Sequence, residues 1–173
     1  MAKLIALSPC SGLLPLEIGG IVVTEVSIDR LTSVAAFDGK TKATSTSLKD
    51  QVGAGLAAPN RRSGAVSWFG HGVWMVTGAV SLDGLAAVSD QTDAWAVVHI
   101  EGLGVEDVLA RLVPVDLRGH IFHVDHVAKT MLGHLSVTIT RIGPQGFEIM
   151  VMRSMAATLV HDLQIAMRGV ALR

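Results

Sequence analysis

Three histidines and one aspartate fall close together in the segment His120-Ile-Phe-His123-Val-Asp125-His126. Imidazole and carboxylate side chains bind zinc and similar cations when they converge on one point. A three-residue step drifts about 60° around a helix, and on a strand it sends His123 to the opposite face from His120 and His126. Only an irregular loop would bring all three together. We therefore expect ordinary polar loop histidines here and no metal site.

The other reactive side chains lack the partners that catalysis needs. Cys10 has no base beside it in a regular element, and no serine lies in a Gly-x-Ser-x-Gly turn. His71 lies between two glycines, which is typical of a solvated turn rather than of a catalytic base. Gly102-Leu-Gly104 lacks the third glycine of a dinucleotide-binding loop, and the adjoining acidic side chains would repel a pyrophosphate. The residues indicate no active site in this chain.

Two further groups are candidates for binding rather than for catalysis. Arg61 and Arg62 are able to hold an anionic ligand, although such a pair is more typical of a solvated turn. Trp68, Trp74 and Trp95 all fall in runs that predict strands, which favours core or interface packing over a stacking platform for a flat ligand. We retain Arg61, Arg62 and Trp74 as candidate ligand or interface contacts.

Composition points to a protein partner. The 173-residue chain is long enough for one domain, or for two small lobes that share a core. Its 14 Lys and Arg residues balance 15 Asp and Glu residues, so we expect no positive surface for nucleic acid. Charged residues make up 17% and apolar residues 50%, whereas a soluble domain carries about 25% charged residues. No apolar run reaches the ~18 residues of a membrane span, so the apolar excess indicates an interface between subunits.

The first twenty residues differ from the rest. Glycines and prolines interrupt residues 1–20 and no periodic pattern appears there, which predicts an N-terminal arm. Its Leu13 and Leu14 are expected to be buried against another chain. The arm also holds Cys10, the single cysteine, and one thiol without a partner is typical of a reducing compartment, so we expect a cytoplasmic protein.

Periodicity divides the single domain, residues 21–173, into two similar halves, about 21–90 and 91–173. The first half is expected to contain a strand over 21–28 that continues into 31–37, a loop over 38–46, a helix from Ser47 to before Pro59, a hairpin of 65–69 and 73–77, and a helix over 82–88 capped by Ser81. The second half is expected to contain a strand over 95–100, a helix over 105–112, a hairpin of 131–142 and 147–152, and a helix over 155–167 capped by Ser154.

The order β-α-β-β-α therefore occurs twice. This repetition predicts an α+β fold of two ferredoxin-like βαββα units. Each unit is expected to have an antiparallel sheet that packs its helices on one face.

Short motifs follow one another along residues 55–165. In the first half they are Pro59-Asn-Arg-Arg62, Gly64-Ala-Val-Ser-Trp68-Phe-Gly70 and Trp74-Met-Val76. In the second half they are Trp95-Ala-Val-Val-His-Ile-Glu-Gly102, Asp107-Val-Leu-Ala-Arg-Leu112, Pro114-Val-Asp-Leu117, Ala128-Lys-Thr130, His134-Leu135, Phe147-Glu-Ile149 and Arg153-Ser-Met-Ala156. In this order the motifs resemble the gamma subunit of heterotetrameric sarcosine oxidase.

The resemblance implies an accessory subunit without an active site of its own. The complex would be a bacterial flavoenzyme that oxidatively demethylates sarcosine or a related N-methyl amine, with tetrahydrofolate as the one-carbon acceptor. FAD, FMN, NAD and tetrahydrofolate would then belong to partner alpha, beta and delta subunits. The resemblance also adds Arg153 to the candidate contacts, and self-association of the isolated chain is expected.

Two alternatives stay open. The same α+β unit resembles the folate-binding domain of aminomethyltransferase-like proteins. A free-standing folate-binding protein would hold a pterin in a cleft between the two halves, using a carboxylate and Arg61 or Arg62. A homo-oligomeric binding module is the third interpretation. Only the sarcosine oxidase interpretation demands flavoprotein partners.

Overall fold

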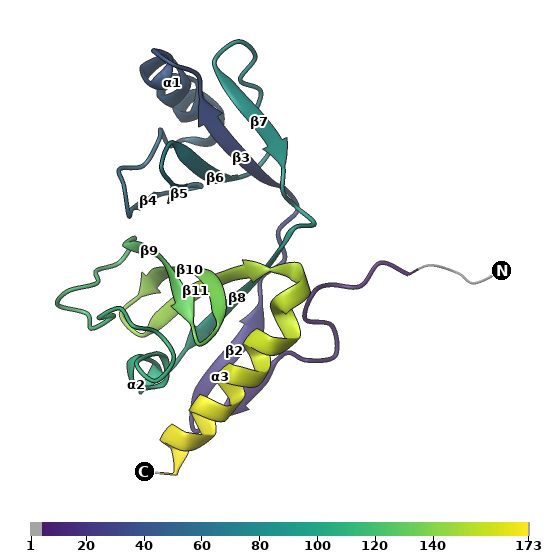
Figure 1. The fold of residues 1–173 in the computed structure, drawn as a ribbon, viewed down its shortest axis with the longest axis vertical. Helices are drawn as coiled ribbons and strands as arrows, with labels where there is room; N and C mark the ends of the chain where they lie inside the picture. Colours follow the sequence, from purple (N-terminus) through teal and green to yellow (C-terminus); the bar gives the residue numbers. More distant parts are fainter. Residues whose placement is uncertain (1–4, 173) are drawn as a thin grey trace.

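The computed structural model describes residues 5–172, which form two antiparallel β-sheets with helices beside them (Figure 1). The strands are β1 (Leu16–Ile18), β2 (Ile21–Glu25), β3 (Leu31–Ala36), β4 (Arg62–Ser63), β5 (Val66–Gly70), β6 (Val73–Thr77), β7 (Ala86–Asp90), β8 (Trp95–Glu101), β9 (Val127–Leu132), β10 (Leu135–Gly143) and β11 (Gly146–Met152). The helices are α1 (Thr41–Val52), α2 (Val105–Leu109) and α3 (Ala156–Ala171), with a 3₁₀ turn, η1 (Arg153–Met155), before α3. Within residues 5–172 no helix is long and apolar enough to cross a membrane.

The two sheets repeat one strand order. Four neighbouring strands run β4-β5-β6-β3 in the five-stranded sheet and β9-β10-β11-β8 in the six-stranded sheet. Helix α1 follows β3 and helix α2 follows β8, so each unit has the order β-α-β-β-β along the chain. The predicted α+β fold with two repeated antiparallel units is confirmed. An additional strand, β4 or β9, precedes each hairpin.

The strand that leads into each unit pairs with the other unit. Strand β2 precedes β3 in the chain but pairs with β8, where Val22 lies opposite Glu101. Strand β7 precedes β8 but pairs with β3, where Ala86 lies opposite Ala36. The two units have therefore exchanged their leading strands. The predicted strand over 21–28 and its continuation over 31–37 consequently lie in different sheets, which corrects the expectation of one continuous strand.

Each sheet buries one face under helices and turns the other face toward the second sheet. Leu48 of α1 packs with Val34 of β3 in the core of the five-stranded sheet. Leu109 of α2 and Leu163 of α3 belong to the larger core of the six-stranded sheet. Figure 1 accordingly shows α1 beside the upper sheet and α2 and α3 beside the lower one. Successive side chains of a strand point to opposite faces of its sheet. Every second side chain of each sheet therefore points into the space between the two sheets.

The helix predicted over 82–88 is wrong. Residues 81–85 form a turn, in which Leu82 is buried in the core of the five-stranded sheet, and β7 follows. The spacing of Leu82, Leu85 and Val88 suits a helix, but Leu85 hydrogen-bonds through its carbonyl oxygen to the Phe37 N–H at 3.0 Å. Pairing with β3, which is distant in the sequence, satisfies the backbone hydrogen-bonding groups of β7. A local sequence pattern does not reveal this pairing.

Two predicted helix boundaries also move. Helix α1 begins at Thr41 rather than at Ser47, so residues 41–46 are helical instead of a loop. The reason is Thr44, which is fully buried and donates a hydrogen bond from Oγ1 to the Leu85 carbonyl oxygen at 3.2 Å. A buried, satisfied threonine anchors this turn without an apolar signal. At the other end, η1 occupies Arg153–Met155, and Ser154 makes no capping bond to α3.

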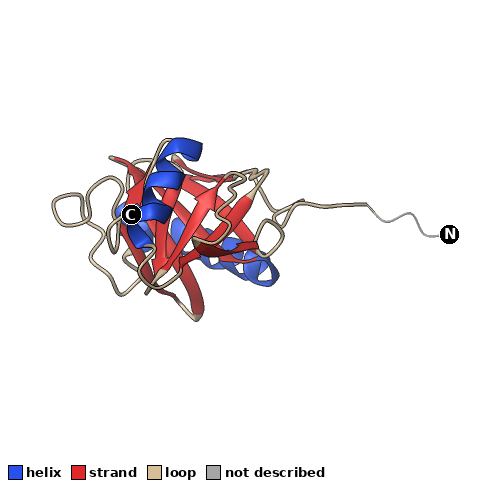
Figure 2. Ribbon diagram, turned by 90° about the horizontal axis from the view of Figure 1, so that it is seen from above, coloured by secondary structure: helices blue, strands red, loops and turns tan. Residues whose placement is uncertain are grey.

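The predicted N-terminal arm, residues 1–20, is only partly free, and its first four residues lie outside the described residues. Ile5 and Leu7 are exposed, and Figure 2 shows this end of the chain extending away from the domain. Cys10, in contrast, is fully buried in the larger core, and Leu14 packs against that core. Strand β1 pairs with β2. The chain's own core therefore buries Cys10 and covers part of Leu14, which corrects the expectation that another chain must bury them, whereas Leu13 is 40% exposed.

Candidate binding site

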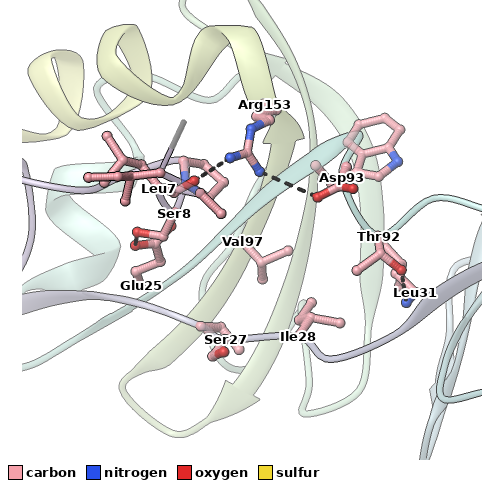
Figure 3. A pocket seen from close by; sticks show the side chains of 15 residues that line it. Leu7, Ser8, Glu25, Ser27, Ile28, Leu31, Thr92, Asp93, Val97 and Arg153 are labelled. Carbon is pink, nitrogen blue, oxygen red and sulfur yellow. Dashed lines mark hydrogen bonds and ion pairs between the residues drawn. The ribbon is translucent and has the colours of Figure 1, made fainter. Parts of the chain in front are cut away.

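A hollow of about 740 Å³ lies between the N-terminal segment 5–9, the crossing segment 25–28 and the start of β8 (Figure 3). Its walls combine charge from Glu25, Asp93 and Arg153 with apolar surface from Leu31 and Val97. Sites for small molecules usually enclose roughly 300–1,000 Å³ and mix apolar walls with a few polar groups. This hollow therefore has the size and the lining of a binding site, either for a small ligand or for a segment of a partner.

Arg153 fastens the N-terminal segment to the rim of the hollow. Its backbone N–H donates to the Ala94 carbonyl oxygen at 2.9 Å, which fixes the start of η1. Its Nη2 donates to the Leu7 carbonyl oxygen at 2.5 Å, while Nη1 lies 3.9 Å from Asp93 Oδ1. The Asp93 side chain is fully exposed, so water screens this ion pair and it contributes little. The bond to Leu7 is the one that holds the segment.

Glu25 holds the same segment from the other side. Its carboxylate accepts a hydrogen bond from Ser8 Oγ at 2.6 Å and one from the Cys10 N–H at 2.9 Å. Burial, followed by the charge of Glu25, raises the pKa of the Cys10 thiol to about 11. The thiol is therefore protonated at neutral pH, and Cys10 packs rather than acts as a nucleophile.

Trp95 lies where the hollow meets the space between the sheets. Its ring packs edge-on against Phe69 of β5, with the ring centroids 5.2 Å apart. Both rings pack against a small apolar cluster that joins the sheets, made of Leu31, Met75, Val97 and Met150. The predicted packing role of Trp95 is therefore confirmed. Its Nε1–H is buried and has no hydrogen-bond partner among residues 5–172.

A partly enclosed cavity of about 160 Å³ lies between the two sheets. Residues 26–28, Leu31 and Val97 line both this cavity and the outer hollow, so the crossing segment separates the two. Thr138 and Thr140 face the cavity from β10, because Ile139 takes the alternate position in the larger core. The six-stranded sheet therefore lines the inner cavity with both polar side chains, Thr138, Thr140 and Glu148, and apolar ones, Val97 and Met150.

Arg62 closes this cavity and connects the sheets. From β4 its Nη2 lies 2.9 Å from Asp125 Oδ1, and its Nε donates to the same oxygen at 3.0 Å. Its Nη1 lies 3.8 Å from Glu148 Oε1 of β11. Glu148 in turn meets His99 Nε2 of β8 at 3.1 Å. Of the two arginines that the sequence singled out, Arg62 is thus already engaged by two carboxylates.

The remaining candidate contacts lie apart from this site. Arg61 is exposed and donates a hydrogen bond from Nη1 to the Asn60 carbonyl oxygen at 2.9 Å. Trp74 packs against the core of the five-stranded sheet and donates from Nε1 to the Ala57 carbonyl oxygen at 2.8 Å. Leu13 is 40% exposed in the turn before β1. Of the predicted contacts, the structure brings only Arg153 to the hollow and only Arg62 to the inner cavity.

The histidines of residues 120–126 do not converge. His123 and His126 pack edge to face, with ring centroids 5.0 Å apart, whereas His120 is exposed. Burial, then the charges of Arg61 and His123, lower the pKa of His126. In the part of the chain that the structure describes, no group of three His, Cys, Asp or Glu residues is arranged to hold a metal ion.

Sequence reasoning missed Arg141 as an organising residue. Arg141 occupies an inward position of β10, two residues after Ile139, and only 2% of its surface is exposed. Its guanidinium donates to the carbonyl oxygens of Leu117 and Pro144, and it lies over the Phe147 ring at 4.5 Å. An arginine on the apolar face of an alternating strand is the signal that predicts such a buried, multiply bonded side chain.

These features define a class of protein: two antiparallel sheets from a repeated α+β unit, with exchanged leading strands and a hollow clasped by the N-terminal segment. The sequence matches no family model and no curated protein. Among solved structures, the fold is similar to that of a chain in the heterotetrameric sarcosine oxidase from Corynebacterium sp. U-96, determined in complex with pyrrole 2-carboxylate. The TM-score is 0.81 at 22% identity, over 96% of this chain and 96% of that chain.

The resemblance expected from the sequence motifs is therefore confirmed at the level of the fold. A second solved structure, the aspartate kinase of Clostridium acetobutylicum, matches with a TM-score of 0.38 at 11% identity, over 87% of this chain and 34% of that chain. We draw nothing from this weaker likeness. The likeness to a chain of the sarcosine oxidase is a likeness of fold.

Proposed function

We propose that this chain is the non-catalytic gamma subunit of a heterotetramer of the sarcosine oxidase kind. In this proposal the complex oxidatively demethylates sarcosine or a related N-methyl amine, with tetrahydrofolate as the one-carbon acceptor. The observation that carries the proposal is a fold shared over 96% of both chains with a chain of such a complex. A match over the full length of a chain is what a subunit-for-subunit correspondence requires.

Exposed apolar side chains beside the clasp, the N-terminal segment 5–9 that Arg153 and Glu25 hold by hydrogen bonds, support a role in assembly. Leu7 is 63% exposed, Met152 56% and Met155 42%, and Leu7 and Met152 border the same shallow depression next to Arg153. Contiguous exposed apolar surface usually marks an interaction site, and methionine adapts to the shape of a partner. We place an interface with a larger subunit here, and we propose Leu13 as a further contact.

The proposal assigns the cofactors to other chains. FAD, FMN, NAD and tetrahydrofolate would be bound by alpha, beta and delta subunits in the cytoplasm. The chemistry of the hollow supports this division, because Arg153 and Glu25 are engaged by the chain's own backbone and the Cys10 thiol is protonated. Nothing in this arrangement performs a reaction by itself.

The decisive experiment is purification of the affinity-tagged chain from its own host. We expect larger subunits to copurify, the preparation to show flavin absorbance, and oxygen consumption to depend on added sarcosine or another N-methyl amine. The isolated recombinant chain is the control, and it should be colourless and inactive. Stoichiometric flavin in the isolated chain, or a tagged chain that leaves the host as a monomer, would contradict the proposal.

The second candidate is a free-standing folate-binding protein. It is favoured by the inner cavity, which holds Arg62 and Glu148 between the two units as a pterin site would. Its volume of about 160 Å³ is below the roughly 300 Å³ of small-molecule sites, and Arg62 is already paired. Calorimetric titration of the isolated chain with tetrahydrofolate separates the candidates, because the gamma-subunit proposal expects no heat of binding.

A further inference from the structure

Strand β7 is an open edge of the five-stranded sheet. It pairs with β3 on one side only. Strand β2 holds the equivalent place in the six-stranded sheet, since both are leading strands that pair with the first strand of the other unit. The outer side of β2 is covered by β1, in antiparallel register from Leu16 opposite Val23 to Ile18 opposite Ile21. One sheet therefore has a covering strand that the other lacks.

The backbone of β7 presents unused hydrogen-bonding groups along this edge. At the two ends of the ladder, the Gln91 N–H donates to the Leu31 carbonyl oxygen at 2.8 Å and the Phe37 N–H donates to the Leu85 carbonyl oxygen at 3.0 Å. Antiparallel pairs alternate between bonded and non-bonded positions, so the odd-numbered residues of this strand bond to β3. The N–H groups of its even-numbered residues, such as Val88, face outward. No other strand in residues 5–172 reaches them.

The usual protections of an edge strand are missing from β7. Natural edges carry lysine, proline, a bulge or an inward charge that prevents pairing with another chain. Residues 86–90 contain neither lysine nor proline, and their register with β3 has no bulge. The one charge, on Asp90, is countered by Arg30 at 3.0 Å and by the Thr92 hydroxyl at 2.6 Å. Val88, at the centre of the strand, is 41% exposed.

We infer that β7 receives an extended segment of a partner subunit, added antiparallel to β7 as β1 is added to β2. The segment places an apolar side chain beside Val88, on the face where Val34 is buried in the core of the five-stranded sheet. Main-chain hydrogen bonds hold the segment and the alternate side chains select it. This inference rests on the proposed function, which supplies the partner, and it adds a second interface on the opposite sheet from the clasp.

Amide hydrogen exchange, resolved to single residues, tests the inference on the complex purified from the host. In the isolated chain the Val88 amide should exchange fast and the Ser89 amide slowly, because only Ser89 is bonded to β3. In the complex the Val88 amide should slow markedly while Ser89 changes little. A complex that forms with Val88 still exchanging fast overturns the inference and leaves the proposed function standing. Concentration-dependent protection of Val88 in the isolated chain assigns the edge to a second copy and also overturns it.

A pair of variants provides the second readout. Val88→Pro removes the outward N–H without removing a bond to β3, and edge strands accept proline at such positions. Val88→Thr retains the N–H and is the matched control. We expect Val88→Pro to weaken assembly about tenfold, as the loss of one hydrogen bond does, and Val88→Thr to assemble normally. Equal assembly of both variants, with Val88→Pro shown to be folded by its circular dichroism, contradicts the inference.

Discussion

Arg141 Nη2 lies 2.5 Å from Glu106 Oε1, and this ion pair joins β10 of the six-stranded sheet to the start of α2. Arg141 is 2% exposed, whereas the Glu106 side chain is 36% exposed. The arginine therefore depends on its partner, because a buried charge without a counter-ion is strongly destabilising. Because Arg141 is buried and Glu106 is partly exposed, substitution of Glu106 alone and substitution of both residues should have different effects on stability.

Glu106→Gln should lower the free energy of unfolding by about 1.5–3 kcal/mol, the range for hydrogen bonds to charged groups, because it leaves Arg141 buried without a counter-charge. Adding Arg141→Met to this variant should cost less than the sum of the two single changes, since no unpaired charge remains. Urea unfolding measures all three. Asp107→Asn, on the exposed side of the same helix, is the control and should change little. Additive costs would show that the pair is not coupled.

Cys10 should resist alkylation at neutral pH. With the pKa of its thiol raised to about 11, the reaction with iodoacetamide should be slow at pH 8 and should accelerate as the pH approaches 11. Glu25→Gln removes a charge that raises this pKa, so it should speed the reaction at pH 8, whereas Glu17→Gln on the exposed side of β1 should not.

The same thiol makes stability depend on pH in the alkaline range. The folded state raises the pKa of the Cys10 thiol from its ordinary value of 9.0 to about 11, so between pH 9 and pH 11 the folded state binds a proton that the unfolded state has lost. The contribution is fully present below pH 9 and is lost as the pH rises toward 11. Cys10→Ala should flatten this part of the stability curve. An unchanged slope between pH 9 and 11 in that variant would argue against a buried neutral thiol.

The N-terminal segment should divide into a dispensable part and a structural part. Among the described residues, deleting residues 1–7 removes the exposed side chains of residues 5–7 and the Leu7 carbonyl, so we expect the melting temperature to change little. Deleting residues 1–18 removes Cys10 and β1 from the larger core and should lower the melting temperature by several degrees, since in a chain of this size each loss of 1 kcal/mol corresponds to roughly 2–4 °C. Equal melting temperatures for the two truncations would contradict this division.

The pairing of β2 with β8 predicts that residues 91–173 do not fold alone. A chain split after Asp90 leaves β8 without β2, whereas all five strands of the five-stranded sheet stay together in residues 1–90. Fragment 91–173 should therefore be insoluble or unfolded when made separately and should form one folded complex when made together with fragment 1–90. Circular dichroism and gel filtration of each fragment and of the mixture provide the measurement. A fragment 91–173 that folds and stays monomeric would show that the exchange contributes little.

Local chemistry explains which elements the sequence predicts. Glycines on both sides of His71 supply the hairpin turn, and Gly72 has φ of 68°, a conformation that favours glycine. Trp95–Glu101 is a run of apolar and β-branched residues, and α3 shows an apolar stripe ending in Met167. The local sequence of each of these elements is enough to predict its secondary structure. Each element begins and ends within a few residues of the bounds that its periodicity predicts.

The parts that the sequence did not predict depend on distant partners. Strand β7 forms because its backbone pairs with β3. The helix-like spacing of Leu82 and Leu85 arises instead from a turn that packs in the core of the five-stranded sheet. The hollow is invisible to a local pattern for the same reason, since Glu25 and Arg153 meet the N-terminal segment from far along the chain. Motif reasoning placed Arg153 among the contacts but assigned no role to Glu25, which no motif contains.

Because of the exchange of leading strands, β2 leaves the ribosome long before the strand with which it pairs. Strand β2 emerges with its inward residues Ile21 and Val23, but Val23 pairs with Ile100 of β8, which is synthesised much later. Until then β2 has β1 as its single neighbour and its apolar face is uncovered. Contacts between distant residues form slowly, and such intermediates aggregate. Newly made chains should therefore need protection between the synthesis of β2 and that of β8, and a chaperone that binds apolar strands would raise their yield.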